Sequence, residues 1–169
     1  MSQRTMPAQR PGQSEQDVET PSDFLRAVVR RFGPLTWDLA ATVENRKAPF
    51  CYTPEQDSLV QHWHHERHRG NLWLNPPFGD IARWARKCAE ESALVHADPE
   101  RTDRYDWRVL LLVPASVSAN WYAEHVHGRA LVMPLRPRLT FVGQDDPFPK
   151  DLMLAAFGER PGFEPWRWD

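Results

Sequence analysis

The stretch Leu72-Trp73-Leu74-Asn75-Pro76-Pro77-Phe78-Gly79 decides how this sequence folds. Its first three residues are a short apolar run, which predicts a buried strand. The two prolines cannot extend that strand, because proline lacks a backbone N–H and has a fixed φ. Apolar residues then recur at helical spacing, at Ile81, Trp84, Ala85, Cys88 and Ala89. The sequence therefore predicts a strand, a rigid loop and a helix in direct succession.

Further apolar runs on both sides of this unit predict alternating helices and strands. Helices are expected at residues 24–32, capped by Thr20 or Ser22 with Pro21 near the first turn, after Thr53 with Leu59, Val60 and Trp63, and at 120–125. Strands are expected at residues 35–39, 72–74, 109–113, 130–133, 138–142 and 152–157, with a shorter one at 50–52. The unbroken apolar run at 109–113 is typical of a central parallel strand. This alternation predicts a three-layer α/β fold.

Length and composition are those of one globular domain. The chain has 169 residues, of which 41% are hydrophobic and 26% charged. Residues 1–19 are rich in Gln, Ser, Pro and Arg, which predicts a disordered tail in front of a single domain at residues 20–169. The formal net charge of −2 does not by itself indicate nucleic-acid binding, and the preference for arginine over lysine is equally explained by codon bias.

Several classes of protein are excluded by what the sequence lacks. No apolar run approaches the ~20 residues that a membrane-spanning helix needs, and the first 20 residues contain no apolar core of a signal peptide. Cys51 and Cys88 are too few for a disulfide framework and too isolated for a zinc site. We therefore expect a reduced, intracellular protein without a membrane partner.

The loop after residues 72–74 combines hydrogen-bond acceptors with an aromatic ring. The Asn75 side-chain oxygen and the Pro76 carbonyl are two acceptors, and Phe78 offers a flat apolar face. In a parallel sheet, ligands bind beyond the carboxyl ends of the strands, where this loop falls. Two such acceptors would hold both N–H bonds of a planar amine, such as the exocyclic amine of adenine, while Phe78 stacks on a flipped base. Asn-Pro and Pro-Pro pairs are also common in plain turns, but the position directly after a strand favours the chemical interpretation.

An ordered set of segments around this loop resembles one known family. The set comprises Thr20-Pro21 with Phe24, Asp38-Leu39-Ala40-Ala41, Asn45, Tyr52-Thr53, Asp57-Ser58-Leu59, Asn75-Pro76-Pro77-Phe78, Leu112-Val113-Pro114-Ala115, Arg138-Leu139-Thr140-Phe141 and Pro147-Phe148-Pro149-Lys150-Asp151-Leu152. By these segments, residues 20–157 resemble the phage-type DNA N-6-adenine methyltransferases.

The resemblance implies an abbreviated, Rossmann-like class I methyltransferase fold, with S-adenosylmethionine as methyl donor and adenine in DNA as acceptor. It implies that Asn75, Pro76, Pro77 and Phe78 form the catalytic loop. It also implies that the protein acts in the cytoplasm of a bacterial host or phage-infected cell. The cofactor residues that it implies are Thr20 and Pro21 at the pocket's rim, Asp38 and Ala40 at the end of the first strand, and Asp57, with Glu55 as second candidate, at the ribose hydroxyls.

Three departures from the pattern leave alternatives open. Ala40-Ala41-Thr42 replaces the usual glycine-rich turn, the segment between Asp38 and Asn75 is short, and Phe78 stands where tyrosine is commoner. A methyltransferase for another planar amine, in an RNA base or a protein glutamine, and a catalytically inactive module that binds DNA or protein both remain candidates. Because little of the chain is left for reading bases, we expect short or relaxed sequence specificity; oligomeric state stays open.

The histidines and tryptophans carry less information about function. His62, His64, His65 and His68 lack a carboxylate or cysteine partner at a metal-binding spacing, so we expect a polar helix face and no metal. Phosphate contact by His65, Arg67 or Arg69 is the weaker functional alternative. We expect core positions for Trp37, Trp63, Trp73 and Trp84, and docking onto the domain for Trp166 and Trp168.

Overall fold

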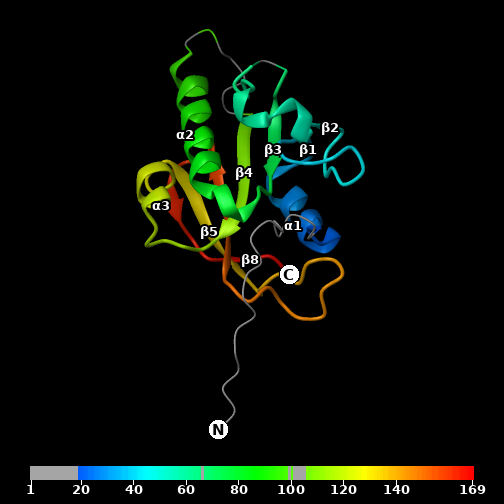
Figure 1. Ribbon diagram of the computed structural model, residues 1–169. Helices are drawn as coiled ribbons and strands as arrows, with labels where there is room; N and C mark the ends of the chain where they lie inside the picture. The colour runs from blue at the N-terminus through cyan, green and yellow to red at the C-terminus, as the bar shows by residue number, and fades with distance from the viewer. Residues whose placement is uncertain (1–18, 66, 99, 101–105) are drawn as a thin grey trace.

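The computed structural model describes residues 19–65, 67–98, 100 and 106–169, and these form an eight-stranded sheet with helices on both faces (Figure 1). The strands are β1 (Leu35–Asp38), β2 (Phe50–Cys51), β3 (Gly70–Leu74), β4 (Trp107–Pro114), β5 (Ala130–Arg136), β6 (Leu152–Phe157), β7 (Gly162–Phe163) and β8 (Trp166–Arg167). The helices are α1 (Ser22–Phe32), α2 (Ile81–Ala97) and α3 (Asn120–His125). Residues 1–18, nearly all of the expected tail, lie outside the described residues.

The order of the strands creates a site where a ligand can bind. The sheet runs β2-β1-β3-β4-β6-β5-β7, with β8 paired to β5. Strands β2, β1, β3 and β4 are mutually parallel, whereas β6 is antiparallel to both β4 and β5. After β1 the chain goes to β2 on one side and then to β3 on the other. In open α/β sheets, ligands bind beyond the strand ends at such a reversal of strand order.

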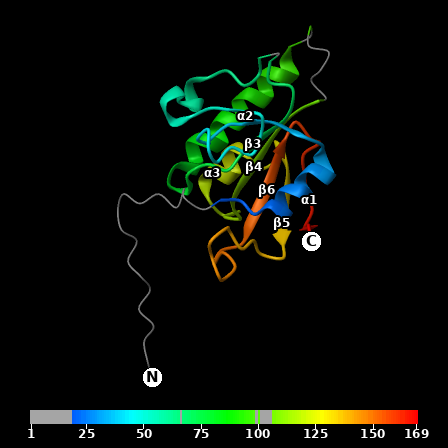
Figure 2. The same cartoon turned by 90° about the vertical axis from the view of Figure 1, so that its right-hand side faces the viewer.

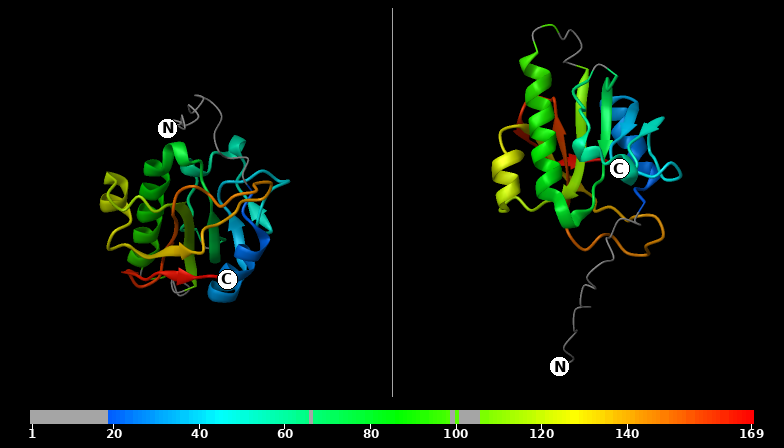
Figure 3. Two further views of the ribbon diagram at one scale, coloured as in Figure 1. Left: turned by 90° about the horizontal axis from the view of Figure 1, so that it is seen from below. Right: turned by 45° about the horizontal axis from the view of Figure 1, so that its top comes forward.

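The central strands bury alternate side chains on opposite faces of the sheet. Along β4, Val109, Leu111 and Val113 join one core, and Leu110 and Leu112 join the other. The first core lies under α2 and α3, which contact each other, and the second lies under α1 (Figures 2 and 3). A continuous apolar strand therefore reflects helices on both faces, and the predicted three-layer α/β fold is confirmed.

Two of the expected elements differ in the structure. The segment after Thr53 forms two short 3₁₀ turns, Pro54–Gln56 and Ser58–Val60, in place of a longer helix. The start signals were correct for a single turn, because Thr53 and Gln56 form a capping box. Asp57 then adopts a left-handed φ of 44°, which ends that turn, and its side chain accepts a hydrogen bond from Leu59 N in the next.

Residues 138–142 are also not a strand. Leu139 and Phe141 are buried at alternating positions, as a strand would place them. Their backbone pairs irregularly, however: the Leu139 carbonyl accepts from Phe148 N, and Val142 N donates to the Glu19 carbonyl. Alternating burial without a hydrogen-bond ladder produced the wrong prediction.

The start of α1 and the carboxyl-terminal residues, which pack against α1, were both the subject of predictions. The predicted caps of α1 were wrong, since Pro21 is the N-cap and no side chain caps the helix. The docking of the carboxyl-terminal tryptophans is confirmed. Trp166 is buried against Phe24 and Phe32, and Trp168 Nε1 donates to the Pro137 carbonyl at 2.7 Å. Within the described residues, no helix combines the length and apolarity needed to cross a membrane.

Candidate functional site

A cavity of about 460 Å³ opens where the order of strands reverses. Asp38 ends β1 and Asn75 directly follows β3, and both residues line this cavity. The two strand ends are joined by the Leu39 N–H, which donates to the Trp73 carbonyl at 2.8 Å. Cavities that enclose a small ligand commonly measure about 300–1,000 Å³. The cavity therefore has the place and the size of a cofactor pocket.

The structure brings five of the predicted site residues to this cavity. Its lining includes Thr20, Asp38, Ala40, Asp57 and Asn75. It does not include Pro21, which caps α1, or Pro76, Pro77 and Phe78, which continue the loop beyond Asn75. Glu55, the second candidate beside Asp57, is exposed and also lies outside the lining. The structure thus favours Asp57 over Glu55 as the carboxylate at the cavity, a choice that the sequence left open.

Asp38 is a buried carboxylate that organises the loop on one side of the cavity. Its side-chain oxygens accept hydrogen bonds from Lys47 N at 2.9 Å and Ala40 N at 3.3 Å. Burial raises the pKa of Asp38 from 3.8 to about 6, while the two backbone N–H groups and the Lys47 charge work in the opposite direction. Each oxygen keeps a further lone pair. The carboxylate can therefore hold its own loop and still accept a hydrogen bond from a ligand.

Asn75 is the first residue of the rigid loop after β3, and it lines the cavity. Its Nδ2 donates to Thr20 Oγ1 at 3.2 Å. In the part of the chain that the structure describes, no protein donor reaches Asn75 Oδ1, and no backbone N–H reaches the Pro76 carbonyl. The Pro77 carbonyl, in contrast, accepts from Asp80 N at 3.3 Å. Neither of the two acceptors that the sequence singled out therefore has a protein donor among the described residues, and of the two residues only Asn75 lines the cavity.

Phe78 is half-buried beside the loop and belongs to an aromatic chain. Its ring meets the Phe148 ring nearly edge-on, with centroids 5.8 Å apart and planes at 70°. Phe148 in turn meets the buried Phe141 at 90°. Phe141 lies in the segment 138–142, which was expected to form a strand, and Phe148 lies beyond that segment. These contacts fix the plane of the Phe78 ring from one edge and leave part of it exposed.

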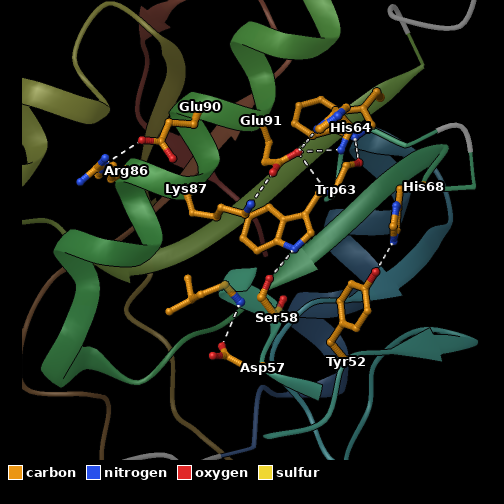
Figure 4. A network of polar contacts seen from close by, with 12 residues as sticks. Tyr52, Asp57, Ser58, Trp63, His64, His68, Arg86, Lys87, Glu90 and Glu91 are labelled. Carbon is orange, nitrogen blue, oxygen red and sulfur yellow. Dashed lines mark hydrogen bonds and ion pairs between the residues drawn. The ribbon is translucent and has the colours of Figure 1, made fainter. Parts of the chain in front are cut away.

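A buried carboxylate on α2 holds the segment that carries Asp57 (Figure 4). Glu91 Oε2 accepts from the backbone N–H of Trp63 at 2.9 Å and of His64 at 2.8 Å, and it contacts His64 Nδ1 at 2.5 Å. Its other oxygen pairs with Lys87. Burial works to raise the pKa of Glu91, but the hydrogen bonds from Lys87 and His64 hold the pKa below its ordinary value. Trp63 Nε1 continues the network to the Ser58 carbonyl, next to Asp57.

His64 and His68 take part in these polar contacts, and the described residues at 62–68 form no helix, so the expectation of a polar helix face was wrong. His68 is fully buried, and its Nε2 lies 2.9 Å from Tyr52 Oη. His62, His64 and Glu91 place one potential metal-ligand atom each within 4.8 Å of one another, so α2 supplies the carboxylate that the local sequence lacked. Both Glu91 oxygens already have protein partners, however, which argues for a structural clamp.

Several residues that line the cavity were not predicted as site residues, although Tyr52 was part of the family resemblance and Trp73 and Trp84 were expected in the core. Lys47 and Tyr52 follow Asp38 on the chain, whereas Trp73 and Trp84 come from β3 and α2; all four line the cavity. Trp84 had been assigned to the core alone. Its helical spacing was visible, but the strand order that turns one edge of α2 toward the cavity was not.

Comparisons with known proteins give a family match, a relative and a structural neighbour. The family model for DNA N-6-adenine-methyltransferase (Dam) matches residues 9–151. A relative from Escherichia phage T1, described as a DNA N-6-adenine-methyltransferase, is 26% identical over 121 residues, which cover 72% of this chain and 45% of the relative. The chain therefore spans less than half the length of that relative. A modification subunit of a putative type I restriction enzyme from Vibrio vulnificus YJ016 aligns in structure with a TM-score of 0.48 and 15% identity, covering 89% of this chain and 47% of that chain.

Proposed function

Because the chain belongs to the phage-type DNA N-6-adenine-methyltransferase family, we propose that it transfers a methyl group from S-adenosylmethionine to the exocyclic amine of adenine in DNA. The observation that carries the proposal is the position of Asn75, whose amide faces a cavity of about 460 Å³ at the strand reversal. The proposed unit is a single methyltransferase domain over residues 20–169.

The residues around the cavity fit S-adenosylmethionine. The cofactor carries an ammonium group, a carboxylate, a sulfonium and a ribose, so it needs acceptors for the ammonium group and for two hydroxyls, together with apolar walls. Asp38 would accept from the ammonium group, Asp57 would accept from the ribose hydroxyls, and Trp73 and Trp84 would pack against the adenosine. Thr20 and Ala40 would complete the pocket, with Pro21 behind Thr20. When bound, the cofactor would supply an electrophilic methyl group on a sulfonium.

The catalytic loop would prepare the amine of the target base. The lone pair of that amine is delocalised into the adenine ring, which makes it a poor nucleophile. Asn75 Oδ1 and the Pro76 carbonyl would each accept one N–H bond and so favour tetrahedral geometry at the nitrogen. The same acceptors would stabilise positive charge that develops there. Pro77 would stiffen the loop, so that the acceptors keep their places without reorganisation.

Phe78 would hold the adenine ring after it leaves the duplex. An enzyme that modifies a base must extrude it from the stack and offer it a stacking partner. The Phe78 ring is fixed at one edge by Phe148 and is still partly exposed, which suits such a partner. Stacking on an aromatic ring tolerates any base, so the choice of adenine would come from Asn75 and Pro76.

Methyl incorporation from labelled S-adenosylmethionine tests the proposal. We expect the label in 6-methyladenine of duplex DNA, and not in RNA or in protein glutamine. Incorporation into RNA or protein instead would favour another planar amine, and saturable cofactor binding without any incorporation would reject the assignment. In Asn75→Ala we expect turnover to be lost and cofactor binding, measured by calorimetry, to be retained, because that side chain faces the amine.

A further inference from the structure

Thr20 and Asn75 are 55 residues apart in the sequence and meet at the cavity. The Asn75 Nδ2 donates to Thr20 Oγ1 at 3.2 Å, and Thr20 is only 3% exposed. We propose that Thr20 is a positioning residue, which fixes the Asn75 carboxamide so that Oδ1 and not Nδ2 faces the target amine. The inference rests on the proposed function and adds to it a role that cofactor contact alone does not give to Thr20.

The chemistry of a carboxamide explains why it needs an anchor. Its two ends have nearly the same shape, but the oxygen accepts hydrogen bonds and the nitrogen donates them. Rotation by half a turn would place N–H donors against the N–H donors of the amine. The Thr20 hydroxyl holds the carboxamide in place, and the observed donation from Nδ2 to Thr20 Oγ1 leaves Oδ1 free to accept from the amine. Among the described residues, Asn75 makes no other side-chain hydrogen bond, so this bond alone anchors the carboxamide.

Thr20 is itself held on both sides. Its neighbour Glu19 accepts a hydrogen bond at its carbonyl from Val142 N, at 3.0 Å, and pairs with Lys47 Nζ at 2.6 Å. On the other side, the Pro21 carbonyl accepts from Leu25 N at 3.1 Å in the first turn of α1. The hydroxyl therefore sits on a backbone that the sheet loops and the helix both fix. A fixed acceptor can orient an amide at little entropic cost.

Two variants separate a positioning role from a cofactor contact. Thr20→Val keeps the shape of the side chain and removes the acceptor, whereas Thr20→Ser keeps the hydroxyl. Thr36→Val is the matched control: its hydroxyl donates to the Arg69 carbonyl at 2.6 Å, and Thr36 does not line the cavity. Each variant is assayed for kcat on duplex DNA, for S-adenosylmethionine affinity by calorimetry, and for thermal stability.

We expect Thr20→Val to lower kcat by about tenfold, the value of one oriented hydrogen bond, with cofactor affinity within about twofold of wild type. Thr20→Ser should restore kcat to within about threefold, and Thr36→Val should leave it unchanged. An unchanged kcat in Thr20→Val, or a loss confined to cofactor affinity, would overturn the inference.

A structural readout keeps this inference distinct from the proposed function. The side-chain Nδ2 protons of Asn75 are assigned in ¹⁵N–¹H spectra by their loss in Asn75→Ala. In Thr20→Val, one of them should move upfield, whereas Thr20→Ser should resemble wild type. Unchanged Asn75 resonances in Thr20→Val refute the positioning role even if DNA is methylated. A wild type without methylation refutes the proposed function, while the spectra still decide the orientation of the amide.

Discussion

The Asp38 carboxylate accepts a hydrogen bond from the backbone N–H of Lys47, at 2.9 Å and nine residues along the chain. This bond closes the loop that follows β1 over one side of the cavity, with Lys47 and the loop residues Ala40, Ala41, Thr42 and Asn45 in its lining. In the absence of a glycine-rich turn, a buried acid holds the backbone next to the proposed cofactor. Its ionisation then becomes a property of the site.

Cofactor affinity should depend on pH through Asp38. Burial raises its pKa to about 6, and only the ionised form attracts an ammonium group. We therefore expect S-adenosylmethionine affinity to fall as the pH drops from 7 to 5, and Asp38→Asn to bind weakly with no such dependence. Calorimetry at several pH values checks this. A wild-type affinity that is flat over the range, or an equal slope in the variant, contradicts it.

The same raised pKa affects folding stability in the opposite direction, because stability should fall with rising pH while cofactor affinity rises. Because the folded protein binds this proton more tightly than the unfolded chain does, the contribution of Asp38 to stability declines as the pH rises from about 4 to about 6 and is constant above that. The free energy of unfolding of wild type, relative to Asp38→Asn, should therefore decrease over that window in urea titrations. A relative stability that rises there would contradict the assigned pKa.

Asp57 and Glu55 form a matched pair for testing the ribose contact. Asp57 lines the cavity and Glu55 does not, although both are exposed carboxylates. Asp57→Asn should lower cofactor affinity by about tenfold, the lower end of a hydrogen bond to a charged group. Asparagine tolerates the φ of 44° at this position, so the turn should persist. Equal effects of Asp57→Asn and Glu55→Gln in calorimetry would remove Asp57 from the site.

Phe78 should contribute to activity on DNA through its aromatic ring alone. Removing a base-stacking aromatic ring costs about 1–3 kcal/mol, so Phe78→Ala should lower kcat/KM on DNA by roughly tenfold to a hundredfold. Phe78→Tyr keeps the ring and should stay within about twofold of wild type. Steady-state kinetics with both variants provide the comparison, with thermal unfolding as the check on the Phe148 contact. A Phe78→Ala enzyme as active as wild type would rule out stacking.

Glu91 should stabilise the fold far more than its neighbour Glu90 does. Glu91 is buried and binds Lys87, His64 and two backbone N–H groups, whereas Glu90 makes an exposed pair with Arg86 at 2.7 Å. Glu91→Gln should lower the free energy of unfolding by about 3 kcal/mol at pH 7, and Glu90→Gln by less than about 0.5 kcal/mol. Urea denaturation measures both values.

The effect of Glu91→Gln should also fade in acid. The pKa of Glu91 is held below its ordinary value, so the stability that its charge contributes is present above that ordinary value and is lost as the pH falls through the folded pKa. Denaturation of wild type and Glu91→Gln at pH 7 and near pH 3 tests the sign. A difference that grows in acid would contradict the assignment.

The core elements were predictable because their signals are local. The apolar run of β4, the strand-loop-helix unit around Asn75 and the helical spacing of α2 each lie within a short window of sequence. The prediction of a helix after Thr53 was wrong because the same start signal also begins a single turn. The left-handed φ of Asp57 ends that turn. The residues that follow are held by Glu91, which lies 28 residues from Trp63 in the sequence.

The sequence alone determined the family resemblance, the alternation of strands and helices and the acceptor-rich loop, because periodicity and proline geometry act over a few residues. The tertiary structure decided which distant groups share the cavity: Asp57 and not Glu55, and the Thr20 hydroxyl on the Asn75 amide. Those contacts depend on strand order and register, which bring chain segments together only once both faces of the sheet are covered.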